Sequence, residues 1–395
     1  MRSEMSPSRR DILAGGAGLM LANGCAAAQT PHRKIDLWDN TGGPHLRGAV
    51  FSHRRIVPSL DNDFLGPGAV GSPTSDSAIA SLRAAGANLA LLSHPGIYTE
   101  QAPWRLDEPV LEHLDDMVSR CEAAGLFTVI GFRSGPGRSE FSIQRDSAGD
   151  WFPAELVNER VWYDIGAQDA WAEMWRETAR RFGRRRGVAG FLLMIEPNAN
   201  QAALPPGGEI WDAGELGDRT AGTPGDWPAL AARLCRTIRS VDADIPILVS
   251  PDGYANARFV DLLDLNVVPG CVLAIHDYHP RAFTHAWGPM SAASFSPADA
   301  IVSPPDYPRW MLGEYGVRRW AVGAEDYVRQ RLDGLERAGA NSAYFRWDSG
   351  WRRYEAQENG WNPIYGADPD ASSPASATPI VDVLSAAWSR NARRP

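Results

Sequence analysis

Two glutamates close the most apolar segments of this 395-residue chain: Glu196 ends GFLLMIE and Glu314 ends RWMLGE. A carboxylate at the tip of an apolar strand is unfavourable unless it is used, because the strand itself would prefer an aliphatic residue. Two opposed carboxylates can cleave a glycosidic bond. One starts protonated and gives its proton to the leaving oxygen, and the other starts ionised and attacks the anomeric carbon.

The elements that must position these carboxylates follow a regular pattern from residue 46 onward. Short apolar runs of strand length alternate with amphipathic helical stretches. The eight predicted strands are 46–51, 88–92, 126–132, 188–195, 245–250, 271–276, 309–314 and 342–347. The predicted helices are 75–85, 109–124, 168–186, 227–240, 256–264, 324–338 and 377–390, with Gly125 and Gly339 as left-handed caps after two of them.

Strict strand–helix alternation predicts a parallel sheet covered by helices, and eight repeats favour closure into a (β/α)8 TIM barrel. An open doubly wound sheet is the alternative, but it usually has fewer strands and nothing here marks a nucleotide site. In the barrel, Glu196 follows strand four and Glu314 follows strand seven, facing each other across the mouth. The long segments 133–167 and 197–226 also lie at this face, where barrel active sites form.

With these motifs in place, the chain resembles the family 5-type glycoside hydrolases over nearly its whole mature length. The resemblance rests on LRGAVF, on AWAEMWRETARRFGRRRGVAGFLLMIEPN, and on AIHDYHP, MLGEYG and YFRW. It implies a retaining mechanism without a cofactor, with Glu196 as acid/base and Glu314 as nucleophile. It also implies that His276 and Tyr278 form the His-x-Tyr pair after strand six, with Tyr278 bonded to the nucleophile, and that Trp347 is the platform beneath the sugar.

The chain departs from the family pattern at the residues that usually support the two carboxylates. Ile195 stands where the family has an Asn that holds the sugar 2-hydroxyl, and the strand-two segment ANLALLSHP lacks the usual Arg. The His commonly found after strand three is also replaced, in GFRSGPG. Asn198, His94 and Arg133 are the candidates to compensate, with Asn198 and Arg133 predicted to bind substrate.

Two other classes compete with the retaining glycosidase. The missing Asn and Arg favour a carbohydrate-binding barrel that has lost turnover, whereas retention of both glutamates argues against it. A metal-dependent barrel hydrolase would use histidines near the strand ends. The chain offers His53, His94, His276 and His279, but it lacks the His-x-His of such enzymes on the first strand. We therefore predict no metal.

The N-terminus predicts export. Arg9 and Arg10 precede a short apolar stretch of small residues, as in a twin-arginine signal, which we assign to residues 1–28. Cleavage near residues 26–28 and lipid attachment at Cys25 are the two alternatives for its processing. The expected location is periplasmic or secreted, and the remainder, 29–395, contains no linker and is predicted to be a single domain.

Composition limits the partners. The net charge is −9 with 44% hydrophobic residues, so the chain can build a large core and would be repelled by nucleic acid. No apolar run past residue 25 is long enough to span a membrane, and we expect a monomer with a carbohydrate substrate.

The remaining cysteines, Cys121, Cys235 and Cys271, lie in apolar segments without metal-ligand spacing, which favours free buried thiols over one disulfide.

Overall fold

The computed structural model describes residues 33–61, 64–204, 208–264, 270–286, 295–296, 307–347, 360–371, 373–375 and 377–395. These residues belong to one compact unit, Arg33–Pro395. The export signal predicted for 1–28, with Cys25, lies outside them. No helix of the described ranges is long and apolar enough to cross a bilayer.

Eight parallel strands close into a barrel in the order β1-β10-β9-β8-β7-β6-β5-β4. They are β1 (Arg47–Ser52), β4 (Leu89–Pro95), β5 (Phe127–Ser134), β6 (Val188–Leu192), β7 (Ile247–Val249), β8 (Cys271–His276), β9 (Trp310–Tyr315) and β10 (Asn341–Tyr344). Each begins within a few residues of its predicted start, which confirms the (β/α)8 prediction. β2 (Arg54–Arg55) and β3 (Val70–Gly71) form a separate antiparallel pair.

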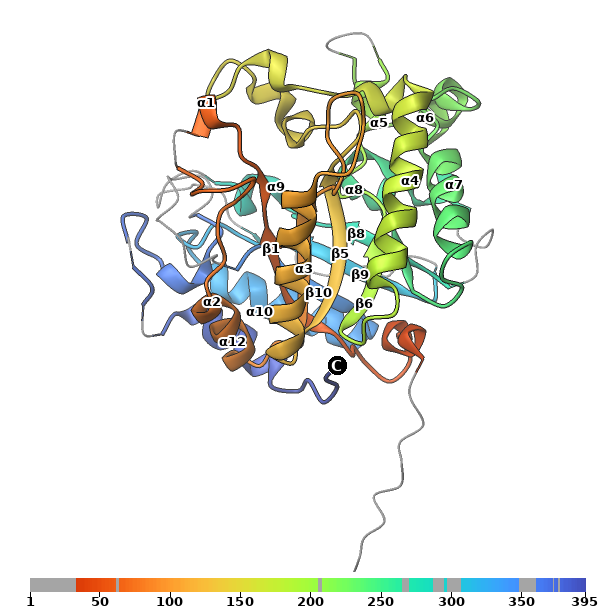
Figure 1. Ribbon diagram of the computed structural model, residues 1–395. Helices are drawn as coiled ribbons and strands as arrows, with labels where there is room; N and C mark the ends of the chain where they lie inside the picture. Colours follow the sequence, from red (N-terminus) through yellow and green to blue (C-terminus); the bar gives the residue numbers. More distant parts are fainter. Residues whose placement is uncertain are drawn as a thin grey trace, which may run out of the picture. The chain divides into compact units, whose positions relative to one another are not determined.

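The helices lie outside the ring of strands (Figure 1). The longer ones are α2 (Asp76–Ala84), α3 (Glu108–Ala123), α4 (Ile165–Phe182), α6 (Ala213–Thr220), α7 (Trp227–Arg239), α10 (Ala324–Ala338) and α12 (Pro379–Trp388). The short ones are α1 (Pro58–Asp61), α5 (Ala199–Ala202), α8 (Asp252–Ala255) and α9 (Arg281–Thr284). The 3₁₀ turns are η1 (Lys34–Trp38), η2 (Glu140–Ser147), η3 (Ala154–Leu156), η4 (Arg160–Trp162), η5 (Ala257–Leu262) and η7 (Pro363–Tyr365).

One predicted helix was wrong in type. Residues 256–264 were expected to form an α-helix, but the structure has the 3₁₀ helix η5 there, capped by Asn256. Apolar residues at helical spacing also suit a short 3₁₀ turn, so periodicity alone did not separate the two.

Side chains alternate between two cores, and this alternation decides which residues can reach the barrel mouth. In β4, Leu89 and Leu91 pack inside the barrel, whereas Ala90 and Leu92 pack against the helices. By the same period, Ser93 faces inward and His94 faces outward toward α3. η1 closes the barrel bottom, where the Trp38 indole donates to the carbonyl of Ala189 at 3.1 Å.

The three described cysteines are free and buried. Cys235 of α7 and Cys271 of β8 lie with their sulfurs 3.8 Å apart, and Cys121 lies in α3.

Candidate active site

Glu314 reaches the mouth because β9 contains an irregularity. Leu312 and Tyr315 both pack in the outer core although they are three residues apart. The pairing of β9 shifts register against β8 and also against β10 at this point. A bulge of this kind inserts one residue and re-aims a side chain, so it brings Glu314 to the inner face, where regular alternation would have turned it outward.

Glu196 follows β6 and lies across the mouth from β9. Its backbone has a positive φ of 52°, which is rare for a residue with a Cβ. One carboxylate oxygen of Glu196, one of Glu314 and one nitrogen of His276 all lie within 4.8 Å of one another. This closeness suits a retaining glycosidase, whose carboxyl groups are about 5–5.5 Å apart, rather than an inverting one.

His276, at the end of β8, bridges the two carboxylates. Its Nδ1 is 3.1 Å from Glu196 Oε1 and 3.6 Å from Glu314 Oε2. Tyr278 donates its hydroxyl to Glu314 Oε2 at 2.9 Å, which is the contact that the resemblance implied for it.

Arg133 supplies the cation that the second strand lacks. It extends from β5, donates through Nε to Ser93 Oγ at 2.9 Å, and places Nη2 3.4 Å from Glu314 Oε1. Arg133 was one of the residues expected to compensate for the missing strand-two Arg. Its charge lies beside Glu314, the nucleophile candidate, and it comes from the third strand of the barrel instead of the second.

The pKa values of these groups are set by competing effects. Burial raises the pKa of Glu314, the negative charge of Glu196 raises it further, and His276, Arg133 and Tyr278 offset only part of the rise. Burial also raises the pKa of Glu196, but the hydrogen bond and charge of His276, with Arg133 and Arg138, outweigh it and lower this pKa. Burial lowers the pKa of His276, yet the two carboxylates prevail and raise it. Because two carboxylates this close resist joint ionisation, the trio shares protons as a unit.

Behind Glu196 lies a buried arginine that sequence reasoning missed. Arg138 is fully buried and donates to the carbonyl oxygens of Arg133 at 2.7 Å, Ile195 at 2.8 Å and Glu196 at 2.6 Å. An arginine in a Gly-rich loop carries no signal in the sequence that would distinguish it from a surface residue, and only the fold brings it here.

Asn198 belongs to this buried network, and the structure does not favour the sugar contact predicted for it. It is fully buried, and its Oδ1 accepts from Arg138 at 3.4 Å and from the indole of Trp162 at 3.2 Å. Its amide donates to Glu159 at 3.3 Å. It therefore holds the long loops together.

Trp347 likewise lies away from the mouth. Its side chain packs on Trp388 of α12 and donates its indole N–H to Ser81 of α2 at 3.0 Å, with 2% exposure. A sugar platform needs a free ring face, and this one has none. Phe345 and Trp361 instead lie beside Tyr278, with ring centroids 6.3 and 5.4 Å from it.

The histidines of the metal hypothesis do not all meet at one site: His276 lies with the two glutamates, whereas two others lie together elsewhere. His53 and His94 pack with His113 of α3, at centroid distances of 4.9 and 5.1 Å from it. Within the described ranges, the group with metal-ligand spacing is Glu196, His276 and Glu314. A cation there would occupy the place of the reacting sugar.

A closed (β/α)8 barrel with two acidic side chains at its carboxyl-terminal mouth is the arrangement that a retaining glycoside hydrolase uses. The family model "Cellulase (glycosyl hydrolase family 5)" matches residues 61–350. The chain therefore belongs to glycosyl hydrolase family 5 and is a glycosidase acting on O-glycosyl bonds.

Solved structures support the fold. Thermotoga maritima Cel5A in complex with cellobiose, a mutant form, is 14% identical with a TM-score of 0.60, over 89% of this chain and 99% of that one. Pseudomonas stutzeri endoglucanase Cel5A is 16% identical with a TM-score of 0.58, over 90% and 97%. A further glycoside hydrolase is 18% identical with a TM-score of 0.60, over 87% and 99%. A search of curated proteins found no similar sequence.

Proposed function

We propose that this glycosidase cleaves β-linked glucans by double displacement, with Glu314 as the nucleophile and Glu196 as the acid/base. The observation that carries the proposal is the placement of both carboxylates within 4.8 Å of each other around His276. One similar solved structure is a complex with cellobiose and another is a hyperthermophilic endo-β-1,4-glucanase, which favours β-1,4-linked glucose polymers as the substrate class.

In the first step, Glu314 attacks the anomeric carbon while Glu196 protonates the departing oxygen. In the second, Glu196 takes a proton from water, which cleaves the glycosyl-enzyme. Tyr278 and Arg133 stabilise the ionised nucleophile. His276 Nδ1 lies nearer to Glu196, at 3.1 Å, than to Glu314, at 3.6 Å, so the pKa of Glu196 is lowered and that of Glu314 is raised. The proposed roles therefore require that the proton shared by this trio lies on Glu196 when the sugar is bound.

A mechanism-based label tests the assignment. Incubation with a 2-fluoro β-cellobioside that has an activated leaving group should attach the sugar to Glu314, and peptide mass spectrometry locates it. A label on another residue, or none in a protein that still hydrolyses aryl cellobiosides, would contradict the assignment. A panel of β-glucans, mannans and aryl glycosides identifies the sugar.

The second candidate is a carbohydrate-binding barrel without turnover, which the replacement of the usual Asn by Ile195 favours. Glu314→Ala separates the two. If the protein only binds sugars, the wild type has no hydrolytic activity and Glu314→Ala keeps its affinity for cello-oligosaccharides. If it is an enzyme, the wild type hydrolyses the substrate and Glu314→Ala does not.

The proposed location is outside the cytoplasm, through the twin-arginine signal of residues 1–28, with Cys25 as the alternative site of lipid attachment. Replacement of Arg9 and Arg10 by Lys should retain the protein in the cytoplasmic fraction, and labelling with a radioactive fatty acid tests the anchor.

A further inference from the structure

A left-handed turn follows β7 at the mouth of the barrel. Gly253, Tyr254 and Ala255 have φ values of 62°, 65° and 63° in succession. Glycine adopts this conformation freely, but Tyr254 and Ala255 carry a Cβ that disfavours it. Consecutive residues in this region persist only where their surroundings hold them, and such strain concentrates at functional sites.

The turn holds the backbone that comes directly after Glu196. The N–H of Tyr254 donates to the carbonyl of Pro197 at 2.8 Å. The carboxylate of Asp252 accepts from the N–H groups of Ala199 at 3.1 Å and Asn200 at 2.9 Å. Three hydrogen bonds thus join α8 to the segment 197–200.

Arg138 holds the same chain from the other end, through the carbonyls of Ile195 and Glu196 at 2.8 and 2.6 Å. Glu196, with its own positive φ of 52°, therefore lies between two stretches of backbone that are held by hydrogen bonds. A carboxylate fixed at its backbone keeps its side chain aimed at one point in the mouth.

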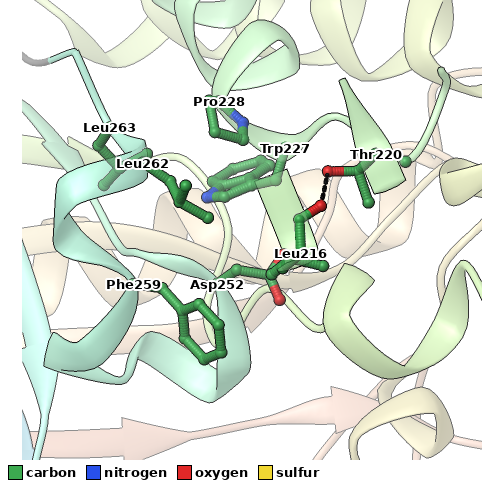
Figure 2. Close-up of a pocket in the computed structure, with 9 residues that line it drawn as sticks. Leu216, Thr220, Trp227, Pro228, Asp252, Phe259, Leu262 and Leu263 are labelled. Atoms are coloured by element: carbon green, nitrogen blue, oxygen red, sulfur yellow. Dashed lines mark hydrogen bonds between the residues drawn. The ribbon is translucent and has the colours of Figure 1, made fainter. Parts of the chain in front are cut away.

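The surroundings of Asp252 indicate that its carboxylate serves the backbone. Figure 2 shows it in a small pocket with Leu216, Trp227 and Phe259, and Glu196 does not line this pocket. Asp252 is 3% exposed, and burial raises its pKa to about 6 in spite of the amides that it accepts from. A carboxylate in apolar surroundings is costly unless its hydrogen bonds are needed.

We propose that Asp252, through the left-handed turn it begins, is a positioning residue that sets Glu196 against the oxygen of the leaving group. The inference rests on the proposed role of Glu196 as acid/base. By this proposal, proton donation also depends on Asp252, a residue of the loop after the fifth barrel strand that does not itself contact the sugar.

The dependence on the leaving group tests this proposal. A 2,4-dinitrophenyl leaving group departs without protonation, whereas an alkyl or glucosyl leaving group needs the acid. In Asp252→Asn, one amide of the segment 199–200 loses its acceptor. We expect kcat/KM to fall about 10- to 100-fold for an alkyl β-cellobioside and to stay within about twofold for 2,4-dinitrophenyl β-cellobioside.

Asp212→Asn is the matched control, because Asp212 caps α6 through the N–H of Glu215 at 2.8 Å and does not contact the segment after Glu196. Asp212→Asn should leave kcat/KM unchanged for both substrates. Equal losses on both substrates in Asp252→Asn, or no loss on either, would overturn the proposal.

A second measurement keeps the two proposals distinguishable. Amide hydrogen exchange at Ala199 and Asn200 should be faster in Asp252→Asn than in the wild type and unaltered in Asp212→Asn. Unchanged exchange refutes the positioning role. If Glu196→Ala lowers kcat/KM equally for both leaving groups, the acid/base assignment itself fails, whatever the exchange shows.

Discussion

At the scale of single residues, the site replaces a missing family residue with one from a neighbouring strand. The strand-two segment LALLSHP contributes Ser93 inward, and Ser93 Oγ accepts from Arg133, which also reaches Glu314. The guanidinium charge therefore acts on the nucleophile from β5. Any cation at this distance lowers the pKa of a buried carboxyl. The position of the charge relative to Glu314 therefore matters more than the strand from which the arginine comes.

Arg133→Met tests this replacement. Without the cation, the pKa of Glu314 rises further above its ordinary value, so the nucleophile ionises only at higher pH. We expect the acidic limb of the kcat/KM profile to move upward by about one pH unit or more, with a loss of about 10- to 100-fold below it and partial recovery above it. Arg176→Met, at a half-buried position of α4 paired with Glu173, should leave the profile unmoved, and an unshifted limb in Arg133→Met would contradict the role.

Trp347, in contrast, contributes to the stability of the fold and not to the site. Because its indole bonds Ser81 and packs on Trp388, Trp347→Phe should lower the free energy of unfolding by about 1–2 kcal/mol and leave KM unchanged. Denaturant unfolding together with steady-state kinetics checks this. A raised KM at unchanged stability would restore the platform interpretation.

At the scale of elements, local turns decide where strands and helices begin and end. Gly125 and Gly339 were predicted as left-handed caps, and they have φ values of 73° and 68°. Their surroundings differ, however. The nearest atom to a Cβ at Gly125 would be Arg83 Nε at 3.8 Å, whereas a Cβ at Gly339 would overlap the carbonyl of Asn40.

Alanine substitutions at these two caps should therefore differ. Gly125→Ala is expected to cost about 1 kcal/mol, which is the conformational penalty alone. Gly339→Ala should cost about 3 kcal/mol or more, because the backbone near Asn40 must also move. Urea unfolding of both variants provides the measurement, and equal losses would mean that the contact with Asn40 is relaxed at little cost.

The bulge in β9 is the element-scale feature that makes the site. Without it, the alternation that places Met311 inside the barrel would place Gly313, not Glu314, at the inner face.

At the scale of the whole molecule, acid should weaken the fold through histidines that join its elements. His53 after β1, His94 of β4 and His113 of α3 form one cluster. Burial lowers the pKa of all three, to about 4 for His113 despite the charge of Asp116. In the unfolded chain these histidines take up protons near pH 6.5, whereas in the folded chain they stay neutral to lower pH. The stability that the neutral cluster retains above pH 6.5 is therefore lost as the pH falls toward 4.

His113→Gln tests the contribution of one member. The fall in the free energy of unfolding between pH 7 and pH 5 should be smaller in the variant by about 1–2 kcal/mol. His279→Gln, at an exposed position outside the cluster, serves as the control. A pH dependence equal to that of the wild type would show that the cluster adapts to charge.

Most of the architecture was predictable because it follows from periodicity. Alternating apolar runs and amphipathic stretches located all eight strands, and the carboxylates at the ends of the fourth and seventh followed from the same pattern. The candidate site was predictable only at strand ends, where Glu196, His276, Tyr278 and Glu314 were expected and where the structure brings these four side chains together. Arg138, Asp252 and Phe345 were not identified, and Trp347 and Asn198 were expected at the mouth, because burial and orientation depend on contacts between segments far apart in sequence.

The sequence by itself determined the order of strands and helices and the acidic residues at their ends, since local hydrophobic period and residue chemistry are written along the chain. Only the tertiary structure decided which face each side chain takes. The bulge that turns Glu314 inward, the cation that crosses from β5, and the left-handed turn beside the backbone of Glu196 depend on hydrogen bonds and packing between distant segments, which no local pattern records.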